Sequence, residues 1–186
     1  MTSTAQHFTD RADRFATILD GAAGLWDAPT PCEDWTARDV VAHVVETERE
    51  FLDRQGYDLG AAPDLTDPAA GFRRHAGAVA EVLGRDGVAD RAYDGYFGPT
   101  TVGDTMADFY GWDLVVHGSD VARATGQPWS VSEEEAADLH ATADAWGDAL
   151  YSEGVCGPAV ELPDDASPSD RLLTRLGRDP GWRPPA

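Results

Sequence analysis

Apolar residues recur at spacings of three and four along most of the chain, which is the pattern of helices that bury one face. Alternation of apolar and polar residues, the pattern of a half-buried strand, is slight. Most connections are short enough to join neighbouring antiparallel helices, so the pattern predicts an all-α helical bundle. The predicted helices span residues 5–23, 36–54, 72–84, 101–125 and 132–150, and a Gly-rich connection spans 85–99.

Three of these helices are expected to begin at a hydroxyl side chain that is followed three residues later by an acidic one. In such a capping box the hydroxyl accepts a hydrogen bond from the backbone and the acid accepts one in return, which defines where the first turn starts. The three boxes are Thr36 with Asp39, Thr101 with Asp104, and Ser132 with Glu135.

The last part of the chain differs from the rest in its proline content. Residues 155–186 hold six of the twelve prolines, which predicts an extended tail around one short helix at SDRLLTRLG. We expect this tail to pack along the bundle, so that residues 1–186 form a single domain of ordinary size.

Charge and hydropathy narrow the range of partners. The net charge is −20, with 34 acidic against 14 basic residues, and such a field repels nucleic-acid phosphates and anionic lipids. The acidic residues are spread along the chain, which favours a solvated surface over a docking surface for a basic partner. No apolar run approaches the roughly 20 residues of a membrane span, and the start shows no secretory signal. We therefore expect a cytoplasmic protein without nucleic-acid or membrane partners.

The cysteines give little indication of a disulfide or a zinc finger. Cys32 and Cys156 stand far apart and lack a second ligand at the short spacing of a finger. Cys32 lies in a loop that leads into the helix of His43. A role for this thiol requires a depressed pKa, and the alternative is an unreactive thiol.

Three residues are candidates for binding a metal ion, namely one aspartate and two histidines. Asp113 and His117 are four apart, which places both side chains on one face of the fourth predicted helix. His43, on the apolar face of the second helix, is the candidate third ligand. An unpaired Asp or His among apolar neighbours is costly, and binding a cation removes that cost. The pattern predicts a metal site. The alternatives are that Asp113 and His117 form an ordinary surface pair and that His43 is a histidine of the core.

Two segments resemble the signatures of the DinB-like metal-binding domains, namely TPCEDWTARDVVAHVVETEREFL and FYGWDLVVHGSDVARATGQPW. More narrowly, they are similar to the N-terminal metal-binding domain of mycothiol-dependent maleylpyruvate isomerase and its stand-alone relatives, whose close resembles ASPSDRLLTRLGRDPGW. The resemblance implies a four-helix core with an additional helix, and a metal held by His43, Asp113 and His117. At Asp113 the isomerase usually has the longer Glu, which implies a metal closer to the helix or more weakly bound.

Residues near the ligands are candidates for supporting roles. Asp120 is one turn beyond His117 and is expected either to orient its second ring nitrogen or to be a plain surface aspartate. Trp35 and Trp112 flank the two ligand segments and are expected to form a wall of the site or part of the core.

Acidic residues after His43 on the same helix are candidates for a general base, and they are Glu46 and Glu50. The other histidines lack a comparable partner at helical spacing. They are expected to be structural or exposed, and they are His7, His75 and His140.

Three protein ligands leave open positions on an ion, which predicts a metalloenzyme that activates a thiol or a water. By resemblance the thiol is mycothiol and the reaction is an S-transfer or an isomerisation of a small electrophile. The alternatives are a non-catalytic metal-binding sensor or interaction module and a water-activating hydrolase. The ligand set suits catalytic Zn²⁺, and Ni²⁺ and Fe(II) accept the same ligands. We expect a monomer or a homodimer.

Overall fold

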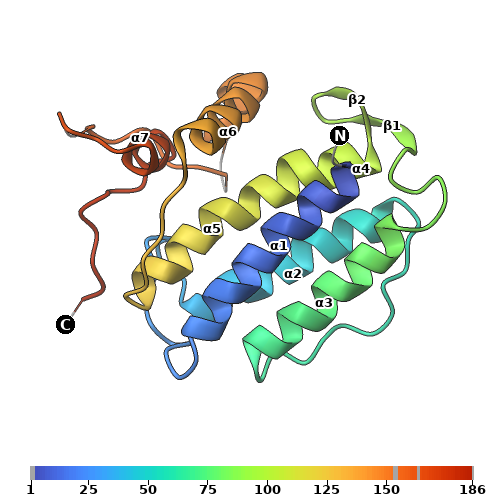
Figure 1. Ribbon diagram of the computed structural model, residues 1–186, viewed down its shortest axis with the longest axis horizontal. Coiled ribbons are helices and arrows are strands. Elements are labelled where there is room, and N and C mark those ends of the chain that lie inside the picture. The colour runs from blue at the N-terminus through green and yellow to red at the C-terminus, as the bar shows by residue number, and fades with distance from the viewer. Residues whose placement is uncertain (1–2, 153–154, 163, 186) are drawn as a thin grey trace. The chain divides into compact units, whose positions relative to one another are not determined.

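The computed structural model describes residues 3–152, 155–162 and 164–185, and these residues are mostly helical (Figure 1). The chain falls into two compact units, Met1–Gln127 and Pro128–Ala186. The predicted mostly-α fold class is confirmed. Within the described ranges, no helix combines the length and the hydropathy that crossing a membrane requires.

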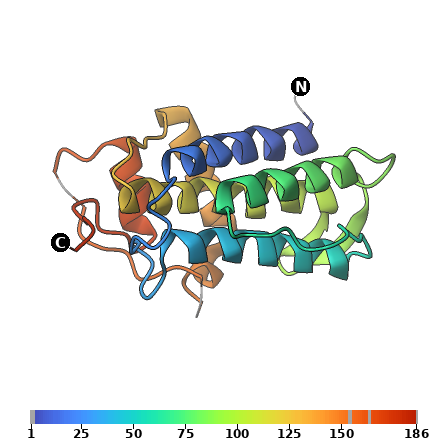
Figure 2. The ribbon, with the colours of Figure 1, turned by 90° about the horizontal axis from the view of Figure 1, so that it is seen from below.

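Four long helices form the first unit and lie side by side in both views (Figures 1 and 2). The first packs against the third and the last, and the second packs against the same two, so that each helix has two neighbours. Large apolar side chains fill the space between them, among them Phe8, Phe15 and Phe72, each with 0% or 1% of its surface exposed. The helices are α1 (Thr4–Gly21), α2 (Ala37–Arg54), α3 (Pro68–Leu83) and α5 (Gly111–Ala124).

The helices begin close to where the hydroxyl side chains predicted. Thr36 and Asp39 form the complete capping box at the start of α2, with the Thr36 backbone N–H 2.9 Å from the Asp39 carboxylate. At the other two predicted boxes, the hydroxyls of Thr101 and Ser132 accept hydrogen bonds from the backbone three residues on. Local hydrogen bonding therefore sets these boundaries, as the sequence indicated.

The predicted connection over 85–99 contains a hairpin that the sequence pattern did not indicate. Strands β1 (Ala92–Gly95) and β2 (Gly98–Thr101) pair antiparallel, with Ala92 opposite Thr101. Both strands are four residues long and contain Gly or Pro, so they show no clear alternation of apolar residues. The hairpin is held to the helices instead by the Tyr93 hydroxyl, which lies 2.7 Å from the Thr105 hydroxyl.

The predicted helix over 101–125 is present, but its hydrogen-bond pattern changes along its length. It runs from α4 (Val102–Thr105) through a π-helical segment (Met106–Tyr110) into α5. The Arg11 guanidinium donates a 2.8 Å hydrogen bond to the carbonyl oxygen of Ala107, inside the π segment. Gly111 allows the approach of this Arg11 side chain, because a Cβ there would lie 3.1 Å from its Cδ. π segments are frequent beside functional sites, and this one ends three residues before Asp113.

The second unit contains α6 (Glu133–Trp146), a 3-10 segment (Gly147–Tyr151) and α7 (Pro168–Arg175). The helix predicted over 132–150 therefore changes to a tighter turn at Gly147, and the predicted short helix of the tail is confirmed. Arg171 on α7 makes two hydrogen bonds of 2.6 and 2.7 Å to the carboxylate of Glu133 on α6. The packing of residues 155–186 along the bundle stays a prediction.

Candidate metal centre

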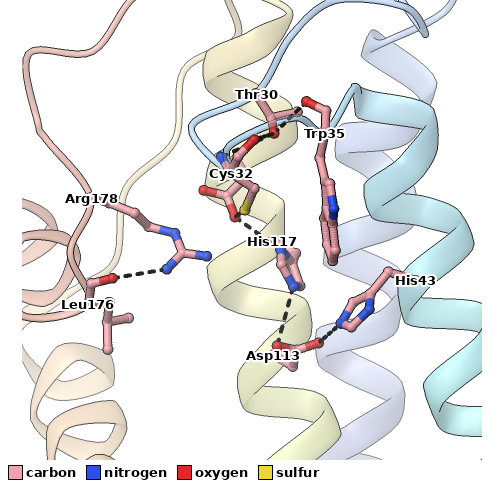
Figure 3. Close-up of polar contacts among 9 residues, drawn as sticks. Thr30, Cys32, Trp35, His43, Asp113, His117, Leu176 and Arg178 are labelled. Carbon is pink, nitrogen blue, oxygen red and sulfur yellow. Dashed lines mark hydrogen bonds and ion pairs between the residues drawn. The ribbon is translucent and has the colours of Figure 1, made fainter. Parts of the chain in front are cut away.

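The side chains of His43, Asp113 and His117 meet between α2 and α5. His43 lies near the middle of α2, and Asp113 and His117 lie one turn apart on α5, which packs directly against α2. Figure 3 shows both imidazole rings turned toward the Asp113 carboxylate. The structure thus brings together the three residues singled out by the sequence.

The distances among these side chains fit one metal ion. His117 Nε2 lies 3.4 Å from Asp113 Oδ1, and His43 Nε2 lies 4.0 Å from Asp113 Oδ2. All the ligand atoms lie within 4.8 Å of one another. Two ligand atoms at about 2.1 Å from a tetrahedral ion are separated by about 3.4 Å. The His117–Asp113 separation already has this length, and the His43–Asp113 separation, measured to the other carboxylate oxygen, is longer.

The site is open on one side and closed on the other. The side chains of His43 and Asp113 are 32% and 25% exposed, whereas that of His117 is 7% exposed. An ion held here would therefore be anchored from the core and would face solvent past His43 and Asp113.

Asp120 lies behind His117, on the side away from the other two ligands. Its Oδ2 is 3.0 Å from His117 Nδ1, and its side chain is 0% exposed. The expectation that Asp120 contacts the second ring nitrogen is confirmed, and the alternative of a surface aspartate is wrong. The Cys32 thiol donates to the same Asp120 oxygen at 3.2 Å. Cys32, His117 and Asp120 thus form a second group whose ligand atoms lie within 4.8 Å of one another.

The loop before α2 delivers both Cys32 and Trp35 to the site. An isolated bridge between Pro29 and Thr36 closes this loop, and the Thr30 hydroxyl lies 3.3 Å from the Cys32 carbonyl oxygen and 3.0 Å from that of Trp35. The Trp35 ring lies 4.7 Å from the His43 ring and 6.0 Å from the His117 ring, measured between centroids. Trp35 therefore forms a wall of the site (Figure 3).

The two histidines have opposite pKa shifts in the metal-free protein. Burial lowers the pKa of His43, and the opposing charge of Asp113 does not cancel this effect. Burial also lowers the pKa of His117, but the Asp113 charge and the hydrogen bonds to Asp120 and Cys32 outweigh it and raise the pKa to about 10. The surroundings of this ring favour a cation.

Sequence reasoning missed a buried pair behind the site, formed by Glu48 on α2 and His75 on α3. Glu48 Oε2 lies 2.8 Å from His75 Nε2, and the two side chains are 1% and 0% exposed. The other polar atoms of the pair, Glu48 Oε1 and His75 Nδ1, have no hydrogen-bond partner among the described residues. Burial raises the pKa of Glu48 although the bond to His75 opposes the shift. The available signal was an acidic residue at helical spacing between the buried Val44 and Leu52.

The other candidate residues from the sequence belong to neither ligand group. Glu46 is exposed, although its charge acts on His43, and the exposed Glu50 lies 3.7 Å from the Arg54 guanidinium. Trp112 is 3% exposed and belongs to the buried residues of α5. The remaining histidines fit the expectation of structural or exposed positions: His75 is buried in its pair, His7 is exposed, and His140 bonds Arg175 in the second unit.

Most of this chain is similar in sequence to known proteins. The family model of the mycothiol maleylpyruvate isomerase N-terminal domain matches residues 5–122, which include all the residues of both ligand groups. Two uncharacterized proteins of Mycobacterium tuberculosis, from strains CDC 1551 / Oshkosh and ATCC 25618 / H37Rv, are each 29% identical over 174 residues. These alignments cover 89% of this chain and 92% of each relative. No solved structure matches at a significant level.

Proposed function

We propose that this chain, which belongs to the mycothiol maleylpyruvate isomerase N-terminal domain family, binds one divalent metal ion through His43, Asp113 and His117. We further propose that it uses the ion to activate a low-molecular-weight thiol for S-transfer to a small electrophile or for its isomerisation. One observation carries the proposal: two imidazole nitrogens and a carboxylate from two packed helices converge on one point.

The charge distribution around His117 supports a cation at this point. Asp113 and Asp120 place a carboxylate on each side of the His117 ring, at 3.4 and 3.0 Å from its two nitrogens. In the metal-free protein a protonated ring would offset only one of these two negative charges. A divalent ion at Nε2 offsets them more completely, because it carries twice the charge and bonds to Asp113 directly.

The ligand set favours zinc among the metals that the site accepts. Two imidazoles and one carboxylate are a common arrangement of catalytic Zn²⁺ sites, which keep a further position open. Ni²⁺ and Fe(II) bind the same ligand types, so the ligands alone do not identify the metal, and its identity requires elemental analysis. Zn²⁺ also has no redox chemistry, which suits a site that handles a thiol.

The thiol fits the open side of the site. When bound, the ion supplies Lewis acidity that lowers the pKa of a thiol or a water. The side chains of His43 and Asp113 are partly exposed on that side, and the Trp35 ring packs beside His43 with its centroid 4.7 Å from that of the imidazole. The family name supports mycothiol as the thiol. In an S-transfer the thiol sulfur would form the new bond to carbon while the bond from that carbon to the electrophile's leaving group breaks, the leaving group would depart with the electron pair, and the thiol proton would pass to solvent.

The first test is the metal content of purified protein by elemental analysis. We expect close to one divalent ion per chain, and its loss in His43→Ala and in His117→Ala. His7→Ala is the matched control, because His7 is exposed and lies on a different helix. Full metal content in the double variant His43→Ala/His117→Ala would show that the assigned site is wrong.

The second test separates a thiol-activating enzyme from the other functions. Co²⁺ is substituted for the native ion, mycothiol is added, and the absorption spectrum and the consumption of a small electrophile are followed. Direct sulfur binding gives a charge-transfer band that a site with only N and O ligands lacks. An unchanged spectrum without turnover refutes the thiol chemistry and leaves a non-catalytic metal-binding module. Turnover of a hydrolysable ester without any thiol would instead indicate a water-activating hydrolase.

A further inference from the structure

We infer that Asp120 and Cys32 are positioning residues for the metal ligand His117, an inference that rests on the proposed metal site. The three side chains form a chain of two hydrogen bonds that share one atom, Asp120 Oδ2. His117 Nδ1 lies 3.0 Å from this oxygen, and Cys32 Sγ lies 3.2 Å from it. Neither residue touches the proposed ion. Each acts through the ring of His117.

The first bond selects the tautomer of His117. A neutral imidazole has one N–H and one lone pair, on different nitrogens. Asp120 is a carboxylate and accepts the Nδ1 proton, which leaves the lone pair on Nε2, the nitrogen that faces Asp113. Ligating histidines in other proteins are commonly held by such a carboxylate, and loss of that partner lowers metal affinity about 10- to 100-fold.

The second bond fixes the carboxylate that holds the ring. Asp120 is 0% exposed, and a buried carboxylate needs hydrogen-bond donors to compensate for the loss of water. The Cys32 thiol is one such donor, and the loop places it there because the Thr30 hydroxyl accepts from the Cys32 backbone N–H at 3.2 Å. The loop before α2 is thereby linked to α5 at the residue that orients the metal ligand. Removing the thiol donor should loosen Asp120 and, through it, the ring.

The same three residues could be imagined as a separate sulfur-containing metal site, since their ligand atoms lie within 4.8 Å of one another. Two observations favour the positioning role. The single lone pair of a neutral His117 cannot serve both groups, and the group with His43 and Asp113 is the more exposed one.

The test compares metal affinity and ring tautomer in four variants, Asp120→Asn, Cys32→Ala, Cys32→Ser and the control Cys156→Ala. Zn²⁺ affinity is measured by competition with a chromophoric chelator, and the tautomer is read from the ¹⁵N shifts of the His117 ring in the Zn²⁺-loaded protein. We expect about 10- to 100-fold weaker binding and a mixed tautomer in Asp120→Asn. Cys32→Ala should show a smaller loss in the same direction, and Cys32→Ser should recover it, because a hydroxyl also donates. Cys156→Ala should match the wild type.

Four results would contradict the positioning roles or the proposed metal site. Wild-type affinity and ¹⁵N shifts in Asp120→Asn would overturn the inference for Asp120, and an unchanged Cys32→Ala would overturn it for the thiol. A sulfur-to-metal band in the Co²⁺ protein without added thiol, lost in Cys32→Ser, would show that Cys32 is a ligand and not a positioning residue. Metal retained in His43→Ala would contradict the proposed site itself, whereas metal lost there with an unchanged Asp120→Asn contradicts this inference alone.

Discussion

The buried Glu48–His75 pair yields a quantitative prediction about stability. The perturbation is the replacement of each partner by Leu, singly and together. Each single change removes the 2.8 Å bond and leaves the other polar group in the core, where both side chains are at most 1% exposed. Such a loss costs about 1–3 kcal/mol if the stranded group is neutral and about 3–5 kcal/mol if it is charged.

The double variant is expected to be far less destabilised than the sum of the two single variants. It leaves no stranded polar group, and buried pairs replaced by apolar residues of similar volume are often neutral or stabilised. The pair also already contains two orphaned atoms, Glu48 Oε1 and His75 Nδ1, so its hydrogen bonding is incomplete at the start. A large favourable coupling energy between the two sites follows.

The assay is denaturant unfolding followed by linear extrapolation, with helical circular dichroism as the signal. Glu50→Leu is the matched control on the same helix, because Glu50 is exposed and its pairing with Arg54 at 3.7 Å is a surface ion pair. It should change the free energy of unfolding by less than about 0.5 kcal/mol. Additive losses in the double variant, or a Glu48→Leu protein as stable as the control, would refute the reasoning.

The pair should also give a pH dependence of known sign. Burial raises the pKa of Glu48 in the folded protein, so the folded state holds this proton more tightly than the unfolded state. The resulting stabilisation is fully present below the unfolded pKa of about 4.3 and is lost as the pH rises through the folded pKa. Glu48→Gln cannot lose this proton. The wild type should therefore lose stability relative to Glu48→Gln as the pH increases, and a constant difference would contradict the shift.

Three further predictions concern the metal site and the surface. Metal binding should release a proton, because the pKa of His117 is raised to about 10 in the metal-free protein. The apparent metal affinity, measured by chelator competition, should therefore rise about tenfold per pH unit between about pH 7 and 10. An affinity that does not change with pH would exclude proton release from His117. Asp113→Glu should keep one ion per chain and Asp113→Ala should lose it, as measured by elemental analysis, because only the former retains a carboxylate. The acidic surface should prevent DNA and RNA binding at physiological salt, so a gel shift at submicromolar protein would disprove the interpretation of the −20 net charge.

Helix positions were predictable because their determinants lie within a few residues of one another. The apolar spacing of α2 and its capping box at Thr36 and Asp39 are short-range features, and both are found as predicted. The spacing of Asp113 and His117 is equally local, since four residues make about one helical turn. The hairpin over 92–101 was missed because its two paired strands are only four residues long, contain Gly and Pro, and show no alternation of apolar residues.

The contacts between helices could not be obtained in the same way. Periodicity placed His43 on a buried face of α2, but only the packing of α2 against α5 brings its Nε2 to 4.0 Å from Asp113. The apolar face of the second helix makes His43 a candidate ligand, but no sequence pattern gives its distance from Asp113. The family resemblance supports the same three residues, and the tertiary structure supplies the distances between them.

The pairings between residues far apart in the sequence were decided by tertiary structure alone. Cys32 and Asp120 are 88 residues apart, and Glu48 and His75 are 27 apart, so no local spacing relates them. Their pairing depends on how the loop and the helices pack, and burial then determines whether each group needs a hydrogen-bond partner. The sequence by itself determined the helices, the starts that carry a predicted hydroxyl cap, and the spacing of Asp113 and His117 on α5. The fold decided which polar groups are buried together, because burial and distance across helices arise only when the whole unit packs.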